Sequence, residues 1–428
     1  MSLWLGLLIL LLLAALGMPL FAVIAGVALL GFHLAGYDLV VLAVELYRLG
    51  DLPGLVTIPL FALAGYLLGE SGAPKRLVRL SNALLGWLPG GLAIVAIVAC
   101  AFFTAFTGAS GVTIVALGAL LYPALREAGY SQRYSLGLVT AGGSLGLLFA
   151  PSLPLILYGF VAGQAGAGEV TIPDLFLAGL LPGALMMLLL SLQAMREGWS
   201  LPRGPRFSWS ELAGALRESA WELPLPVIVL GGIYSGLLAA SEAAAVTALY
   251  VLLVTTLVKR EITFSNLPRV MAEAVRLVGA VLLILGAALA LSAWLVDQEV
   301  PSRLFEWLSR HVHSPLAFLL LLNLFLLAVG MLLDIFSAVV ILVPLLLPVA
   351  AAFGIHPVHL GIVMLANLQL GYFTPPVGMN LFIAAYRFEQ PVGTLVRACI
   401  PFFLVLALAV LLITWWPALS LGLTGAGG

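Results

Sequence analysis

Two clusters of glycine, proline, serine and threonine interrupt the apolar runs of this 428-residue chain, at residues 142–151 and 370–376. A shorter turn precedes each cluster, at residues 107–111 and 330–334. Broken helices expose carbonyl oxygens that coordinate sodium, and their half-helix N-termini offer N–H groups and a positive dipole end to an anion. Serine and threonine add hydroxyl oxygens. The four breaks therefore predict a site that binds an anionic solute and a cation.

The two halves of the chain repeat each other at an offset of 225 residues. Matching interruptions in two halves mark a transporter's binding site, because irregular backbone at membrane depth is tolerated only when it is buried or lines a cavity. Small residues serve helix packing when they are isolated, but their repetition here favours binding, so solute transport is the leading hypothesis. The repeated residues are Pro123, Gly129, Gly146 and Pro151, which recur as Pro348, Gly354, Gly371 and Pro376. The candidate solute contacts are Ser110, Gly143, Ser144, Thr374 and Pro375.

Two carboxylates lie beside the apolar runs. An ionised Asp334 without a partner would cost roughly 2.5–3.5 kcal/mol inside a membrane helix. It could couple transport to a cation or proton, or it could cap the following helix through backbone N–H groups. The helix-start sequence 334–337 favours the cap. Glu242 also fits an acid at a helix N-terminus. Both carboxylates are therefore predicted to be structural helix caps.

The composition excludes a soluble protein. Hydrophobic side chains make up 63% of the chain, charged side chains make up 9%, and the mean hydropathy is +1.19, far outside the range of soluble domains. The net charge of −1 comes without a basic tract, so nucleic acid is not an expected partner. The sequence contains no P-loop and no HExxH motif. We therefore expect neither ATP-driven transport by this chain nor an enzyme.

The apolar runs predict an all-α polytopic membrane protein made of two inverted repeats, each with a re-entrant helical hairpin and an unwound transmembrane helix. Several runs are shorter than the ~20 residues that span a bilayer, so pairs of short runs are interpreted as hairpins. The hairpins are expected at 91–126 and 316–353, and the broken helices at 134–163 and 358–387. The polar stretch 197–222 is the predicted linker between the repeats.

Lysine and arginine sort onto one side of the membrane if the repeats are inverted. Fifteen of the 18 then lie on one side, and Arg48, Arg303 and Arg310 lie on the other. The positive-inside rule makes the first side cytoplasmic. The first hairpin should therefore open from the cytoplasm and the second from outside, and both termini should be periplasmic.

Several stretches resemble the large membrane subunit of tripartite ATP-independent periplasmic (TRAP) transporters, which belong to the ion-transporter superfamily. They are residues 103–110, 146–159, 231–236 with 241–244, and 370–382. The resemblance spans essentially the whole chain and implies a scaffold that holds a mobile transport domain, which moves as an elevator. The implied scaffold segments are 1–90, 164–275, 276–315 and 388–428, and the halves of the transport domain are 91–163 and 316–387.

The resemblance also implies the activity and its partners. Members of the family import small organic acids, such as dicarboxylates or sialic acid, together with sodium ions and without an organic cofactor. They receive the solute from a periplasmic binding protein and work with a small four-helix membrane subunit in the lipid bilayer of the bacterial inner membrane. A stand-alone ion-coupled anion carrier of the same superfamily is the close alternative, and a membrane-embedded hydrolase is the distant one.

Motif matching places two sodium sites on this sequence. Ala109 departs from the family pattern, in which serine is common at this position, and Ala150 departs where proline is common. The residues implied for the first site are Thr107, Gly108, Ser110, Gly146 and Pro151, and those for the second site are Gly330, Gly371, Thr374 and Val377.

Overall fold

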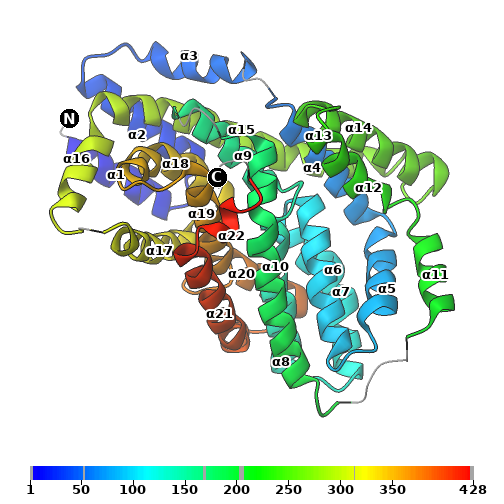
Figure 1. Cartoon of the computed structure of the whole chain (residues 1–428). Helices are drawn as coiled ribbons and strands as arrows, with labels where there is room; N and C mark the ends of the chain where they lie inside the picture. The colour runs from blue at the N-terminus through cyan, green and yellow to red at the C-terminus, as the bar shows by residue number, and fades with distance from the viewer. Residues whose placement is uncertain (1–2, 52–53, 167–169, 202–206, 313, 425–428) are drawn as a thin grey trace.

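The computed structural model describes residues 3–51, 54–166, 170–201, 207–312 and 314–424. Within these ranges the regular secondary structure is helical throughout. Among the described residues, six helices are long and apolar enough to cross a membrane, or seven if one bent pair counts as a single span. The expected all-α polytopic membrane fold is confirmed (Figure 1).

The helices follow one another in two comparable series. The first is α1 (Leu3–Ala15), α2 (Leu20–Leu34), α3 (Val40–Arg48), η1 (Leu49–Asp51), α4 (Thr57–Glu70), α5 (Ala73–Leu85), α6 (Gly91–Thr107), α7 (Ser110–Glu127), α8 (Gln132–Gly142), η2 (Leu145–Leu148), α9 (Leu153–Gln164) and α10 (Ile172–Glu197). The second is α11 (Trp209–Glu218), α12 (Pro224–Pro226), η3 (Val227–Gly231), α13 (Gly232–Tyr234), α14 (Ala240–Leu253), η4 (Val254–Val258), α15 (Leu267–Asp297), α16 (Val300–Ser309), α17 (Pro315–Leu332), α18 (Ile335–Ala352), α19 (Pro357–Gly371), α20 (Met379–Phe388), α21 (Val392–Trp415) and α22 (Ala418–Leu421).

Each predicted hairpin corresponds to a pair of helices separated by a two-residue break. Helix α6 ends at Thr107; the following Gly108 has a φ of +62°, and extended Ala109 leads into α7. A positive φ is readily adopted only by glycine, so the turn forms where glycine stands. In the second hairpin, extended Leu333 and Asp334 separate α17 from α18.

Each predicted broken helix is interrupted at its glycine and proline cluster. Helix α8 passes into the short 3₁₀ segment η2 and then, with a bend of 43°, into α9. Helix α19 ends at Gly371, and α20 starts after Gly378, whose φ is +51°. The cis peptide bonds Ala150–Pro151 and Pro375–Pro376 occupy equivalent positions in the two breaks.

The two repeats are packed across each other. Within each repeat the first hairpin arm lies on its own broken helix, α6 on α8 and α17 on α19. The second arm lies on the far half of the other repeat's broken helix, because α7 packs on α20 and α18 packs on α9. Buried side chains from all four elements belong to one continuous apolar core. The hairpins and broken helices therefore form one interlocked unit.

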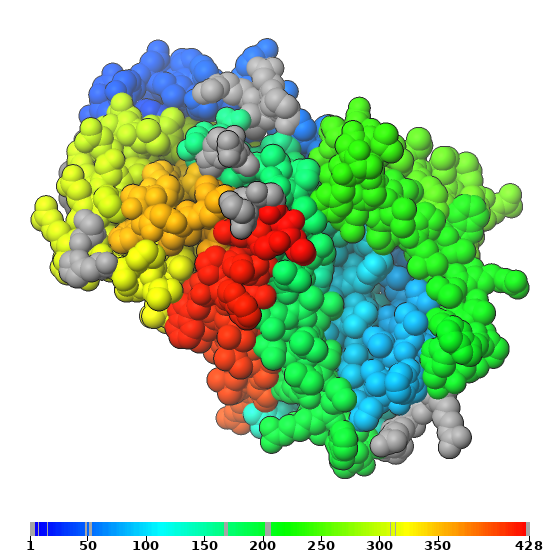
Figure 2. Space-filling view, in the orientation of Figure 1, coloured from blue at the N-terminus to red at the C-terminus, as the bar shows by residue number. Residues whose placement is uncertain are grey.

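Other helices surround this interlocked unit. Helices α4 and α15 pack together, with α2 on α15 and α14 on α4. On the face shown in Figure 2, α21, α10 and the α5–α6 region lie side by side, coloured red, green and blue. Helix α15 begins at Leu267, so the expected boundary at residue 276 falls inside it. Charged residues in its first turns, such as Arg269 and Glu273, lower the local hydropathy, so the apolar pattern did not predict these turns.

The expected linker 197–222 contains the amphipathic helix α11, and its residues 202–206 lie outside the described residues. Leu212 and Ala215 of α11 pack on Leu80 of the amphipathic helix α5. Charged residues alternate with the apolar positions of both helices, so neither contains a continuous apolar run typical of a membrane span.

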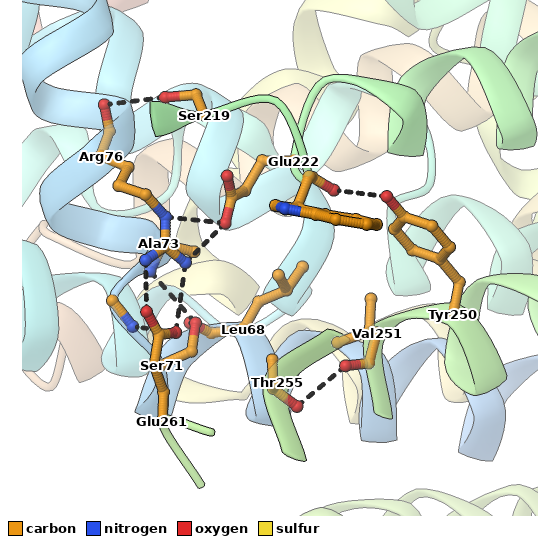
Figure 3. Close-up of polar contacts among 12 residues, drawn as sticks. Leu68, Ser71, Ala73, Arg76, Ser219, Glu222, Tyr250, Val251, Thr255 and Glu261 are labelled. Carbon is orange, nitrogen blue, oxygen red and sulfur yellow. Dashed lines mark hydrogen bonds and ion pairs between the residues drawn. The ribbon is translucent and has the colours of Figure 1, made fainter. Parts of the chain in front are cut away.

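A buried ion cluster joins α5 to two other scaffold segments (Figure 3). The Arg76 guanidinium donates from Nε and Nη2 to Glu222 Oε1, at 2.9 and 2.6 Å, and it also pairs with Glu261. Burial lowers the pKa of Arg76, but the hydrogen bonds to both carboxylates raise that pKa above its ordinary value overall. The cluster ties the start of α5 to the segment before α12 and to the loop after η4.

Candidate functional site

A cavity of about 740 Å³ lies between the interlocked unit and the scaffold helices α4 and α15. This volume is in the range that holds small organic ligands. Both hairpin tips reach it. The lining residues are Tyr66, Gly69 and Glu70 of α4, residues 108–112, Val115 and Ala116 of the first hairpin, Leu147 of η2, Glu273, Arg276, Leu277, Ala280, Val281 and Ile284 of α15, Asp334–Phe336 of the second hairpin tip, and Tyr372, Met379 and Ile383.

The candidate solute contacts do not all reach this cavity. Ser110 lines it. Buried Ser144 instead lies with its Oγ 3.3 Å from the carbonyl oxygen of Gln369, where the two broken helices meet. Gly143 packs against Ile114, Thr374 is buried in its own break, and Pro375 is exposed beside it. The cavity is therefore lined by more residues of the hairpin tips than of the helix breaks.

The residues of the implied first sodium site spread along the contact between the first hairpin and its broken helix. A Cβ added at Gly146 would lie 2.1 Å from the carbonyl oxygen of Ala101 and 2.4 Å from the amide nitrogen of Ala105. Thr107 and Gly108 are buried at the hairpin tip, next to Ser110, and Pro151 is buried in the break. Because Gly146 has no side chain, the backbone of the break can pack directly against α6.

The residues of the implied second site come together more tightly. A Cβ added at Gly371 would lie 2.4 Å from the carbonyl carbon of Gly330, so the two backbones touch. Thr374 donates its hydroxyl to the carbonyl oxygen of Leu370 at 2.8 Å, and its N–H to that of Gly371 at 3.0 Å. Val377 is 42% exposed. Hydroxyl and carbonyl oxygens have further lone pairs, so these atoms can still bind a cation.

The two predicted cap residues lie at helix starts. Asp334 Oδ1 accepts hydrogen bonds from the N–H groups of Phe336 and Ser337, both at 3.0 Å, and the Ser337 hydroxyl donates to Oδ2. Glu242 Oε2 accepts from the N–H of Ala239 at 2.8 Å, just before α14. Asp334 also lines the cavity.

Two buried polar residues that the sequence analysis did not propose as site residues also connect the hairpins and the breaks. Thr104 Oγ1 lies 2.7 Å from Thr113 Oγ1 and 2.9 Å from the carbonyl oxygen of Gly143, so it joins both hairpin arms to the first break. Fully buried Asn380 donates from Nδ2 to the carbonyl oxygen of Thr140 at 3.3 Å and joins the two broken helices. Isolated polar residues inside apolar helices are expensive and often functional, which is the signal that would have found them.

Residues 6–419 match the family described as "Tripartite ATP-independent periplasmic transporter, DctM component". The chain belongs to this family. Like its relatives, it is a transporter permease and not an enzyme. It is 36% identical, over 89% of its length and 88% of the relative's, to the C4-dicarboxylate TRAP transporter large permease protein DctM of Pseudomonas aeruginosa.

Other relatives of the DctM family carry different solutes in their names. The sialic acid TRAP transporter large permease protein SiaM of Vibrio cholerae is 33% identical over 86% of this chain and 85% of its own. The isethionate TRAP transporter permease protein DctMQ of Oleidesulfovibrio alaskensis is 36% identical over 87% of this chain, but over only 58% of its own length. The crystal structure of the Alcanivorax borkumensis YdaH transporter shares the fold, with a TM-score of 0.60 at 16% identity and 88% coverage of both chains.

Proposed function

We propose that this DctM-family chain is the large permease subunit of a sodium-coupled importer of small organic acid anions. The observation that carries the proposal is the cavity at both hairpin tips, with paired helix breaks directly behind it. Helix α7 starts at the cavity without a side-chain cap, so its first N–H groups are available to a carboxylate. The dicarboxylate and sialic acid in the names of relatives belong to the same chemical class of solute.

The packing supports an elevator movement. The two hairpins and two broken helices are interlocked across the repeats, and in this proposal they move as one rigid unit. The cavity lies at the border of this unit with α4 and α15. Sliding of the unit along these scaffold helices would carry a solute held at the hairpin tips from one side of the membrane to the other.

The membrane orientation is proposed from charge. The inner membrane is the site of the transporter, with both termini periplasmic and the lysine- and arginine-rich loops cytoplasmic. The cavity then opens to the cytoplasm, because Glu70 and Arg276 at its rim lie near the ends of α4 and α15 that carry these loops.

Cysteine labelling tests this orientation across α10, which is about 39 Å long at 1.5 Å per residue. A cysteine in place of exposed Ser200 should react only from the cytoplasm, and one in place of exposed Gln164 only from the periplasm. The unmodified chain is the control, because its Cys100 and Cys399 are 2% and 1% exposed and should not react. Reaction of both introduced cysteines from the same side would contradict the proposed orientation.

Sodium coupling is tested at Thr374. The substitution Thr374→Val keeps the side-chain shape but removes the hydroxyl oxygen, and hard cations select oxygen ligands. We expect the sodium concentration for half-maximal uptake to rise about tenfold, the effect of losing one contact to a charged group. The measurement is uptake by the complete reconstituted transporter across a sodium series.

The matched control for this test is Thr255→Val in η4. Thr255 donates its hydroxyl to the carbonyl oxygen four residues earlier at 2.8 Å, as Thr374 does, but it belongs to the scaffold. Its substitution should leave the sodium dependence unchanged. Equal sodium dependence of the Thr374 variant and the unmodified transporter would show that this hydroxyl is not a required sodium ligand.

The proposed partners are a small four-helix membrane subunit and a periplasmic solute-binding protein. The tripartite description of the family supports both partners. The DctMQ relative extends well beyond the part that this chain covers, which fits fusion of a large and a small subunit in that protein.

A further inference from the structure

Four charged side chains line the cavity, and two of them have ion-pair or hydrogen-bond partners. Glu70 pairs with Arg269 at 2.6 Å, and Asp334 accepts three hydrogen bonds at the start of α18. Glu273 lies three residues before Arg276 on α15 and has no ion-pair or hydrogen-bond partner among the described residues. The fourth, Arg276, makes neither an ion pair nor a hydrogen bond within the part of the chain that the structure describes.

Arg276 is the one cation among the described residues of the cavity lining. It lies on α15, opposite the hairpin tips, and its side chain is exposed. The hairpins and broken helices themselves carry no lysine or arginine inside their helical arms, apart from residues 126, 133 and 387 near their ends. A positive charge at the cavity therefore has to come from the scaffold side, and Arg276 is placed to supply it.

We propose that Arg276 is a specificity-determining residue that binds a second anionic group of the solute, so that the cavity prefers dianionic acids. This inference rests on the proposed transport of organic acids. Guanidinium groups match carboxylates with two parallel N–H donors and stay charged at any physiological pH. One carboxylate meets the N–H groups at the hairpin tip, and the other meets Arg276 across the cavity. A monoanionic acid satisfies only the first contact and binds more weakly.

A lipid phosphate is the other anion within reach of Arg276. The same side chain borders a groove of about 490 Å³ lined by apolar residues, among them Leu20, Phe21 and Leu283. Long basic side chains near membrane surfaces extend towards lipid head groups. Because both anions would use the same N–H donors, the experiment has to separate the solute from the lipid.

A reporter cysteine in place of Ala280 gives the required measurement. Ala280 lines the cavity one helical turn beyond Arg276, and both natural cysteines are buried. The complete transporter carrying Ala280→Cys, in phosphatidylcholine nanodiscs, is treated with a negatively charged methanethiosulfonate in the presence of sodium. Succinate and butyrate, which share a four-carbon chain but carry two charges and one, serve as protecting probes. Succinate should slow the reaction at lower concentrations than butyrate does.

Removal of the charge tests the role of Arg276 directly. Adding Arg276→Gln to the reporter should raise the half-protecting concentration of succinate about tenfold and leave that of butyrate unchanged. Arg276→Lys should recover part of the succinate protection, whereas Glu273→Gln, which keeps the cation, should not weaken it. Equal succinate protection with and without Arg276 would overturn the inference, as would no preference for succinate over butyrate.

Two further measurements distinguish the remaining explanations. If phosphatidylglycerol in the nanodiscs abolishes the effect of Arg276→Gln on succinate protection, the arginine binds lipid phosphate and the inference fails. Sodium-driven uptake of organic acids by the unmodified transporter is measured in parallel. Absence of that uptake would refute the proposed function. Loss of the preference for succinate over butyrate in Arg276→Gln, by contrast, tests only the role of Arg276.

Discussion

Uptake is expected to fall to background when Gly146 or Gly371 is replaced by alanine. At Gly146 the new methyl group would lie 2.1 Å from a carbonyl oxygen of α6, and at Gly371 it would lie 2.4 Å from the backbone of Gly330. Both obstacles are backbone atoms, which cannot rotate away as a side chain can. Overpacking typically costs about 1–3 kcal/mol and occasionally more. The two positions are equivalent in the two repeats, so the two losses should be alike.

The control for these substitutions is Gly279→Ala in the scaffold helix α15. A Cβ added there meets no atom within 4 Å, and alanine is the better helix former by about 1 kcal/mol. Membrane insertion, thermal stability and uptake should therefore be retained. The measurements are the amount of folded protein in the membrane and sodium-driven uptake. Normal uptake by the Gly146 or Gly371 variant would contradict the close backbone contact of hairpin and broken helix.

Reconstitution of this chain without partners is expected to give no uptake above background, even with a sodium gradient. A free anion has to lose its hydration before it enters a site built mainly from backbone groups, and we propose that the loaded binding protein delivers it. Addition of the small subunit alone should not restore uptake. Addition of both the small subunit and the loaded binding protein should restore it fully.

The same measurement separates the two function hypotheses. A stand-alone carrier of the superfamily would take up its solute without either partner. Sodium-driven uptake by the isolated chain would therefore replace the tripartite proposal with the stand-alone one. Uptake in a vesicle without a sodium gradient is the control, because a leak through misfolded protein would not depend on the gradient.

The sequence by itself predicted the helical membrane fold and the positions of its breaks. The turn of the first hairpin falls at Gly108 and that of the second at Asp334, both inside the stretches singled out beforehand. The broken helices part at the glycine and proline clusters. Glycine, proline and helix-capping acids act on the backbone of their own segment, so their effects can be predicted without knowing which helices become neighbours. The family follows from the same motifs.

The tertiary structure alone decided which residues of the breaks line the cavity. The exchange of hairpin arms, α7 on α20 and α18 on α9, depends on contacts between residues at least 171 positions apart, and no local pattern encodes them. That packing buries Ser144 and Thr374 behind the hairpin tips and leaves Ser110 and Asp334 at the cavity. It also places α15 and the hairpin tips on the same cavity. In the sequence, Arg276 was only one of the basic residues counted for the membrane orientation; in the structure it is the cation of the described cavity lining. A side chain's chemistry depends on its spatial neighbours, and long-range packing sets those neighbours.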